Sequence, residues 1–123
     1  MPAQGLQRAS RLNKAAQFNQ VLAAAALRVK AGYFNALALP NDGLPARLGM
    51  VIPRRHTRTA VRRNRIKRLI RESFRQQQAC FVGLDIVVML RSRSDATLAT
   101  SDSALLTQLW QALRSCSAPG SSH

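Results

Sequence analysis

The stretch from Arg54 to Arg75 constrains this chain more than any other. It reads RRHTRTAVRRNRIKRLIRESFR and contains ten of the nineteen Lys and Arg residues of the chain, with Glu72 as its only acid. Like charges at this density repel one another. The positive charges must therefore serve a function, be neutralised by a bound partner, or lower the stability of the folded chain.

A helix from about residue 60 to 79 is predicted within this stretch. Neither Gly nor Pro interrupts these residues, and the Thr59 hydroxyl can cap the first turn by accepting from a backbone N–H. At about 100° per residue, one face collects residues that can pack on a sheet: Ile66, Leu69, Ile70, Ser73 and Phe74. Another side collects Asn64, Lys67, Arg68, Arg71 and Arg75, while Arg62, Arg63 and Arg65 crowd the first two turns.

The charge on this helix favours a bound polyanion. Cations at the start of a helix face the positive end of its dipole, and like charges four residues apart, such as Lys67 and Arg71, repel. Phosphate groups would reverse the sign of each interaction. A solvated basic face is the simpler interpretation, but such faces usually intersperse acids, which are missing here. The planar fork of arginine fits phosphate oxygens, so its dominance also points to nucleic acid.

The whole chain indicates a small, strongly basic, single-domain protein. Its 123 residues suffice for one core. The net charge of +14 and the pI near 11.9 make nucleic acid or an anionic membrane surface the expected partner. No apolar run approaches the length of a spanning helix, and the opening residues MPAQGLQRAS lack an apolar signal segment. We therefore expect no membrane partner and a cytoplasmic location.

No residue pattern in the chain predicts catalysis or metal binding. Cys80 and Cys116 do not make a disulfide framework, and neither combines with a histidine at a zinc-site spacing. A protein-only nuclease would need clustered carboxylates for metal ions, but the acids are scattered: Asp42, Glu72, Asp85, Asp95 and Asp102. We predict no catalytic residue and no protein-held metal. A helix-turn-helix DNA-binding module also fits poorly, because no second helix adjoins the basic one through a short turn.

The residues before the basic stretch predict one helix and two strands. Residues 1–12 are expected to be flexible and basic, and a helix is expected from about Lys14 to Leu27. Its apolar face at helical spacing is Phe18, Val21, Leu22 and Ala25. Residues 33–39 and 47–52 read as strands. The turn signal Pro40-Asn41-Asp42-Gly43 between them suggests a hairpin-like pair.

The residues after the basic stretch predict a strand and a last helix. Residues 85–91, DIVVMLR, form a continuous apolar run, which is typical of a central strand covered on both faces. A polar linker follows, after which Thr100 or Ser101 can cap a helix. Its apolar stripe, expected in the core, is Leu105, Leu106, Leu109, Trp110 and Leu113. One domain should thus span residues 13–114, with a flexible tail over residues 115–123.

Residues 60–72, AVRRNRIKRLIRE, resemble the signature of the bacterial ribonuclease P protein subunit, in which an Arg-Asn-Arg core precedes Ile-Lys-Arg and a further Arg one turn on. The resemblance extends weakly over most of the chain. It implies an α+β fold of order αβββαβα, with helices packed on a four-stranded sheet, as in the second domain of a small-subunit ribosomal protein. It also implies a left-handed βαβ crossover, whereas physics alone would predict a right-handed one.

The resemblance implies a function and two binding surfaces. Family members join a catalytic RNA and help it remove the 5′ leader from precursor tRNA, so the chain would belong to an endoribonuclease whose catalytic groups and Mg²⁺ ions are held mainly by RNA. No obligate protein partner is implied. The basic helix would bind the catalytic RNA through Arg62, Arg63, Asn64, Arg65, Lys67, Arg68 and Arg71. A cleft between the first helix and the sheet would bind the leader with Phe18, Tyr33, Phe34, Arg54, Arg55 and Arg91.

The chain departs from the family pattern around that cleft. Relatives carry further aromatics where this chain has Leu22 and Leu37, so stacking by these two is not implied. Arg54-Arg55 replaces the usual Lys-Lys and keeps the charge, and residues 56–59 replace a commoner short link that contains Gly. Phe18 has two open interpretations: a buried helix residue, from its spacing, or a cleft wall that stacks on a base, from the resemblance.

A general RNA- or ribosome-binding module on a similar α+β fold is the alternative function. It explains the positive charge equally well, but it does not explain the Arg-Asn-Arg helix. The two functions differ in whether the protein distinguishes precursor from mature tRNA when the catalytic RNA is present.

Overall fold

The computed structural model describes residues 15–57, 59–92 and 102–117. In chain order its elements are α1 (Ala15–Ala24), β1 (Leu27–Ala31), β2 (Phe34–Pro40), β3 (Arg47–Val51), the 3₁₀ helix η2 (Arg54–His56), α2 (Ala60–Gln77), the 3₁₀ helix η3 (Gln78–Phe81), β4 (Leu84–Leu90) and α3 (Asp102–Ser117). This is the expected αβββαβα order. Residues 1–12 and 118–123 of the expected flexible ends lie outside the described residues, whereas residues 115–117 belong to α3.

The four strands form one mixed sheet in the order β1-β2-β4-β3. β2 pairs antiparallel with β1 and with β4, while β3 and β4 run parallel and are joined through α2. β4 is therefore an inner strand, as its apolar run predicts. Its residues Ile86, Val87 and Val88 are each fully buried.

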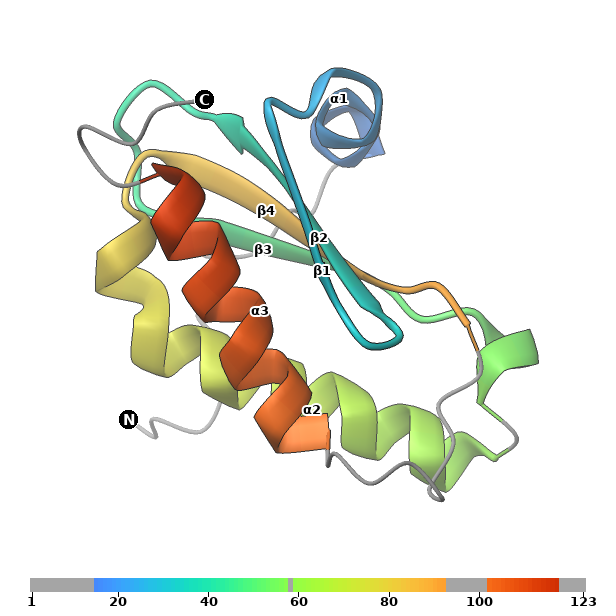
Figure 1. Ribbon diagram of the computed structural model, residues 1–123. Helices are drawn as coiled ribbons and strands as arrows, with labels where there is room; N and C mark the ends of the chain where they lie inside the picture. Colours follow the sequence, from blue (N-terminus) through green and yellow to red (C-terminus); the bar gives the residue numbers. More distant parts are fainter. Residues whose placement is uncertain (1–14, 58, 93–101, 118–123) are drawn as a thin grey trace, which may run out of the picture.

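Helices cover both faces of this sheet. Figure 1 shows α1 on one side and α2 with α3 on the other. The α2–α3 side holds the larger core, where Phe74 and Phe81 pack on Trp110 with ring centroids 5.8 Å and 5.9 Å away. The α1 side holds a small cluster of Val21, Leu37 and Val87. The sheet is thus the middle of three layers with a core on each face.

Residues of β2 alternate between these two cores, because successive side chains of a strand point to opposite faces. Phe34, Ala36 and Ala38 join the larger core, whereas Leu37 and Leu39 join the small cluster under α1. Even-numbered residues of β2 therefore face α2 and α3, and odd-numbered residues face α1.

The helix predicted in the basic stretch is confirmed. Thr59 caps α2, since its Oγ1 accepts from the Arg62 N–H at 3.0 Å. Ile66, Ile70 and Phe74 follow one another at four-residue spacing and are fully buried against the sheet and α3. The basic stretch is thus anchored by three apolar side chains on one side.

The apolar stripe of α3 is also confirmed, because all five of its predicted residues are buried. Trp110 is 2% exposed, and its indole N–H donates to the Ser73 hydroxyl of α2. This bond explains why a serine lies on the apolar face of α2, since a buried indole N–H needs an acceptor. The expected caps Thr100 and Ser101 lie outside the described residues.

Two expectations about the strands are wrong. The first helix was predicted to reach Leu27, but Leu27 begins β1, whose sequence LRVKA alternates apolar and polar residues as a strand does. The predicted pairing of residues 33–39 with residues 47–52 is also wrong, because β4 lies between β2 and β3. The hairpin joins β1 to β2 instead.

The β1–β2 hairpin turns at Gly32 in close contact with α3. Gly32 has a φ of 58°, and a Cβ at this position would lie 2.7 Å from Cδ2 of Leu105. Glycine is thus required twice, by the left-handed backbone and by the space that Leu105 occupies.

A polar network joins β3, β4 and the turn after β2. Arg47 donates to both carboxylate oxygens of Asp85 at 2.7 Å, and the Asn41 side chain donates to the same carboxylate at 2.9 Å. Asp85 is 6% exposed. One of the five acids is therefore committed to holding the sheet together.

Candidate nucleic-acid interface

The basic residues of α2 lie on three different sides of the helix. Asn64, Arg65 and Arg68 are exposed on the solvent side, opposite the buried Ile66, Ile70 and Phe74. We call these three residues the solvent side of α2. They form the part of the predicted interface that is presented outward from a fixed helix.

Arg62 lies on the side of α2 that faces α3. Its guanidinium donates to both carboxylate oxygens of Asp102, at 2.7 Å and 3.1 Å, and the Tyr33 hydroxyl donates to the same carboxylate. The side chains of Arg62 and Asp102 are only 24% and 10% exposed. Arg62 therefore joins the starts of α2 and α3, and its membership of the RNA-binding group stays a prediction.

Arg63 and Lys67 lie on the opposite side of α2, beside the end of β3. Arg63 Nε donates to the Ile52 carbonyl at 3.1 Å. The pKa of Lys67 is lowered, first by burial and then by the positive charges of Arg63, Arg71 and Arg54. These four cations thus lie close enough to affect one another, and we call Arg54, Arg63, Lys67 and Arg71 the basic flank.

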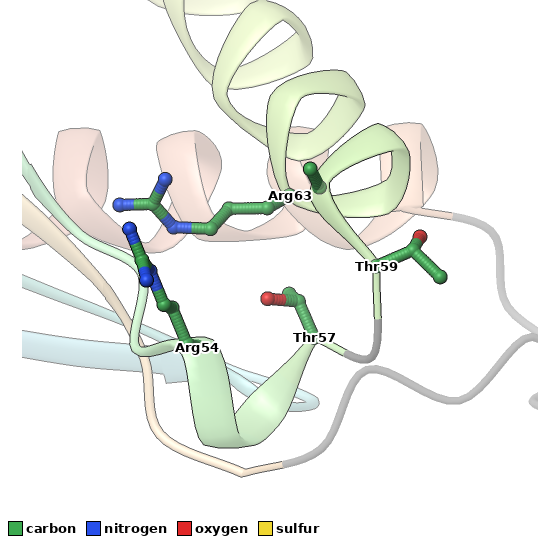
Figure 2. A pocket seen from close by; sticks show the side chains of 5 residues that line it. Arg54, Thr57, Thr59 and Arg63 are labelled. Carbon is green, nitrogen blue, oxygen red and sulfur yellow. The ribbon is translucent and has the colours of Figure 1, made fainter.

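A pocket of about 380 Å³ opens at the start of α2, beside this flank. It is lined by Arg54, Thr57, Thr59, Ala60 and Arg63. Figure 2 shows the side chains of Arg54 and Arg63 extending from η2 and from α2, with their guanidinium ends near each other in this view. The link between β3 and α2 supplies both threonines.

The cleft predicted between the first helix and the sheet does not contain Tyr33 or Phe34. Tyr33 is 5% exposed and Phe34 is fully buried, and both belong to the larger core on the far face of the sheet from α1. Their rings contact each other with centroids 5.0 Å apart. The prediction for Phe34 is corrected by the alternation of β2 side chains, which puts Phe34 in the larger core. Tyr33 lies in the turn before β2, with its hydroxyl bound to Asp102 of α3.

The other predicted cleft residues are separated. Phe18 belongs to α1, but its side chain lies outside the described part of the structure. Arg54 joins the basic flank on the α2 side, and Arg55 is exposed on η2. Arg91 is exposed at the end of β4, where its N–H donates to the Tyr33 carbonyl at 2.9 Å.

Sequence reasoning missed two cations on the sheet face under α1. Leu27 and Val29 of β1 pack on the larger core, so Arg28 and Lys30 lie on the opposite face, in register with Leu37 and Asn35 of β2. Both are exposed. The alternation of LRVKA carries this signal, but the predicted helix takes in Leu27, and residues 28–31 are assigned to no element.

The acids do not assemble a metal site in the described part of the chain. Asp85 and Asp102 are bound by arginines, while Asp42 and Glu72 are exposed on a turn and on α2. Asp95 lies outside the described residues. No three His, Cys, Asp or Glu side chains gather among residues 15–57, 59–92 and 102–117.

Comparison with known proteins shows which family this chain belongs to. The model of the family described as Ribonuclease P matches residues 6–117 of the 123. The chain belongs to the ribonuclease P protein family. The ribonuclease P protein component of Halorhodospira halophila is 39% identical over 115 residues, which cover 93% of both chains. That of Nitrosococcus oceani is 48% identical over 85 residues, covering 69% of this chain and 71% of the relative.

Solved structures of this family share the fold. The ribonuclease P protein of Staphylococcus aureus superposes with a TM-score of 0.74 at 25% identity, covering 86% of this chain and 96% of that protein. The protein from Thermotoga maritima superposes with a TM-score of 0.71 at 29% identity, covering 85% and 94%. No helix in the described part of this ribonuclease P protein has the length and apolar character to cross a membrane.

Proposed function

We propose that this chain is the RNA-binding protein subunit of a ribonuclease P ribonucleoprotein, in which it binds the catalytic RNA and the 5′ leader of precursor tRNA. The observation that supports this most strongly is the solvent side of α2. A helix anchored by three buried apolar residues presents Asn64, Arg65 and Arg68 outward, within a chain of this family.

The catalytic RNA is proposed to bind the solvent side of α2 together with the basic flank. Arginines on a packed helix have fixed positions, so they can match phosphate groups that are fixed in a folded RNA. Recognition would rest mainly on phosphates and shape, because double-stranded RNA presents little sequence information to side chains. Arg62 contributes indirectly, by holding α2 and α3 together.

The leader is proposed to bind the sheet face under α1. Arg28 and Lys30 on β1 and Arg91 after β4 supply exposed cations for a single strand. Met89 and Val51, which are partly buried beside the small cluster, supply apolar surface. Phe18 enters this proposal only through the family resemblance.

The chemical step is proposed to belong to the RNA. Mg²⁺ ions held mainly by that RNA would activate water and stabilise charge on the scissile phosphate. The described acids of this chain do not fit a catalytic metal site, because two are bound by arginines and two stand apart. The protein would lower the repulsion between two RNAs and align the substrate.

Cleavage of precursor tRNA at low Mg²⁺ concentration tests this function. Three reactions are compared: catalytic RNA alone, this protein alone, and both together. We expect a mature 5′ end in the mixture only. Cleavage by the protein alone would place catalytic groups in this chain and contradict the proposal.

A binding assay separates the alternative of a general RNA- or ribosome-binding module. The affinity of the protein–RNA complex is compared for precursor and mature tRNA. The proposed function requires a preference for the precursor, since only the precursor carries a leader. Equal affinities, with no stimulation of cleavage, would support the general module.

A further inference from the structure

The pocket at the start of α2 brings two arginines to one point. Arg54 comes from η2 and Arg63 from the first turn of α2, and both line the same pocket. Figure 2 shows their guanidinium ends near each other, with the Thr57 hydroxyl directed toward the space beside them. Two positive charges thus converge on a hollow that also contains hydroxyl groups.

A backbone contact fixes the direction of Arg63. Its Nε donates to the Ile52 carbonyl at the end of β3, at 3.1 Å. Because this bond uses Nε, the two terminal nitrogens of the planar guanidinium keep their four N–H donors for a ligand. Arg63 is therefore oriented before any ligand arrives, which lowers the entropy cost of binding.

No carboxylate in the described part of the chain neutralises these two arginines. The ion pairs there are Arg47 with Asp85 and Arg62 with Asp102. Burial, and next the charges of Arg63, Arg71 and Arg54, lower the pKa of Lys67, so this lysine adds a further positive charge near these arginines. Bringing like charges together is unfavourable unless an anion joins them.

We infer that this pocket binds one phosphate group, presented by the backbone of a bound RNA. The inference rests on the proposed function and adds to it a defined phosphate subsite. Arginine forks suit phosphate oxygens, and the start of α2 adds the positive end of a helix dipole. A volume of about 380 Å³ also leaves room for part of the attached ribose.

This subsite is separate from the solvent side of α2. Asn64, Arg65 and Arg68 are exposed on the solvent side, whereas the pocket lies between the start of α2 and η2. Thr57 and Thr59, which line it, come from the link between η2 and α2. The subsite therefore depends on residues outside the Arg-Asn-Arg signature.

Binding of inorganic phosphate to the full chain tests the chemistry of the pocket. Inorganic phosphate is titrated into the protein in a calorimeter, at constant ionic strength set with NaCl. The unchanged protein is compared with Arg54→Gln and with Arg75→Gln. Arg75 is exposed in the last turn of α2, so its replacement removes the same charge far from the pocket. We expect Arg54→Gln to weaken phosphate binding about tenfold and Arg75→Gln to leave it nearly unchanged.

Binding of the catalytic RNA tests the source of the phosphate. The slope of log affinity against log salt concentration should fall by about one for Arg54→Gln, since one phosphate contact is lost. The double variant Arg54→Gln/Arg63→Gln should also lose about one, because both arginines share the same phosphate. Thr57→Val should weaken binding without changing the slope, since it removes a hydroxyl but no charge.

Each outcome decides the inference. Loss of phosphate affinity together with the shared slope change supports an RNA phosphate in the pocket. Loss of phosphate affinity with unchanged RNA binding supports a site for free phosphate and overturns the RNA source. Equal phosphate affinity in Arg54→Gln and Arg75→Gln overturns the site itself. If the mixture still cleaves precursor tRNA in that case, the proposed function stands without the subsite.

Discussion

Arg62 and Arg68 lie on the same helix, but their neighbours give them different tasks. Arg62 is paired with Asp102 and partly buried, whereas Arg68 is exposed on the solvent side. The value of an arginine to the fold depends on what remains when it is removed. Without Arg62, the carboxylate of Asp102 would be left only 10% exposed with its main partner gone.

We predict that Arg62→Ala lowers the free energy of unfolding by roughly 1–3 kcal/mol, between the values for exposed and buried pairs. Arg68→Ala should leave it nearly unchanged. Urea unfolding measures both. In a double-mutant cycle, Asp102→Ala should be less harmful when Arg62 is already absent. Additive effects of the two substitutions would contradict the pairing.

Tyr33 gives the fold a dependence on alkaline pH. Burial, and next the hydrogen bond to the Asp102 carboxylate, raise the pKa of Tyr33 to about 12. The folded protein therefore holds this proton more tightly than the unfolded chain, whose tyrosine titrates near pH 10. The resulting stabilisation is complete below pH 10 and is lost as the pH rises from about 10 to about 12.

We predict that the unchanged protein loses its stability advantage over Tyr33→Phe across this pH range. Urea unfolding from pH 8 upward measures the difference between the two proteins. All other titratable groups are present in both proteins, so their contributions drop out of the difference. A constant difference up to pH 12 would contradict the raised pKa.

At the scale of elements, the sequence predicted best where one pattern sufficed. The cap at Thr59, the buried face of α2 and the stripe of α3 follow from a 3.6-residue period and were found at the right positions. β4 was recognised as an inner strand because its apolar run needs cover on both faces. The exposed arginines of α2 follow from the same helical period.

Predictions from the sequence were poor where the position of a side chain depends on residues far away along the chain. Asp102 lies forty residues from Arg62, so no local pattern could show that this arginine is taken. Phe34 could face either side of the sheet until its strand pairing fixed the parity. The missed strand β1 has only five residues after a helix of alanines, and its alternation is too short to override the helical signal.

We predict that Gly32, in the turn between β1 and β2, tolerates substitution less well than Gly43 does. Ala at Gly32 or Gly43 must adopt a left-handed backbone, which costs about 1–2 kcal/mol. At Gly32 the new methyl must also displace the buried Leu105, whereas nothing lies within 4 Å at Gly43. Thermal unfolding should therefore show a clearly larger loss for Gly32→Ala than for Gly43→Ala. Equal losses of stability would mean that Leu105 of α3 can move away from the new methyl group without destabilising the fold.

At the scale of the molecule, the net charge of +14 acts against the fold when no RNA is bound. Salt screens this repulsion, so we predict that the urea midpoint rises as NaCl is raised from about 0.01 M to about 0.2 M. Arg75→Glu, which lowers the net charge by two at an exposed site, should show a shallower rise. A midpoint that falls with salt would indicate that the two ion pairs outweigh the general repulsion.

The contact of Arg62 and Tyr33 with Asp102 also bears on how much the chain length can vary. Asp102 is the first residue of α3, and its bonds to Arg62 and Tyr33 hold the start of this helix to α2 and to the turn before β2. We therefore predict that the number of residues between positions 92 and 102 has little influence on where α3 lies. About four Gly or Ser residues added there should cost only a few tenths of a kcal/mol in urea unfolding, and a loss above about 1 kcal/mol would show that the connection itself holds the helix. The start of α3 is thus a position where related chains can gain or lose residues without rebuilding the core.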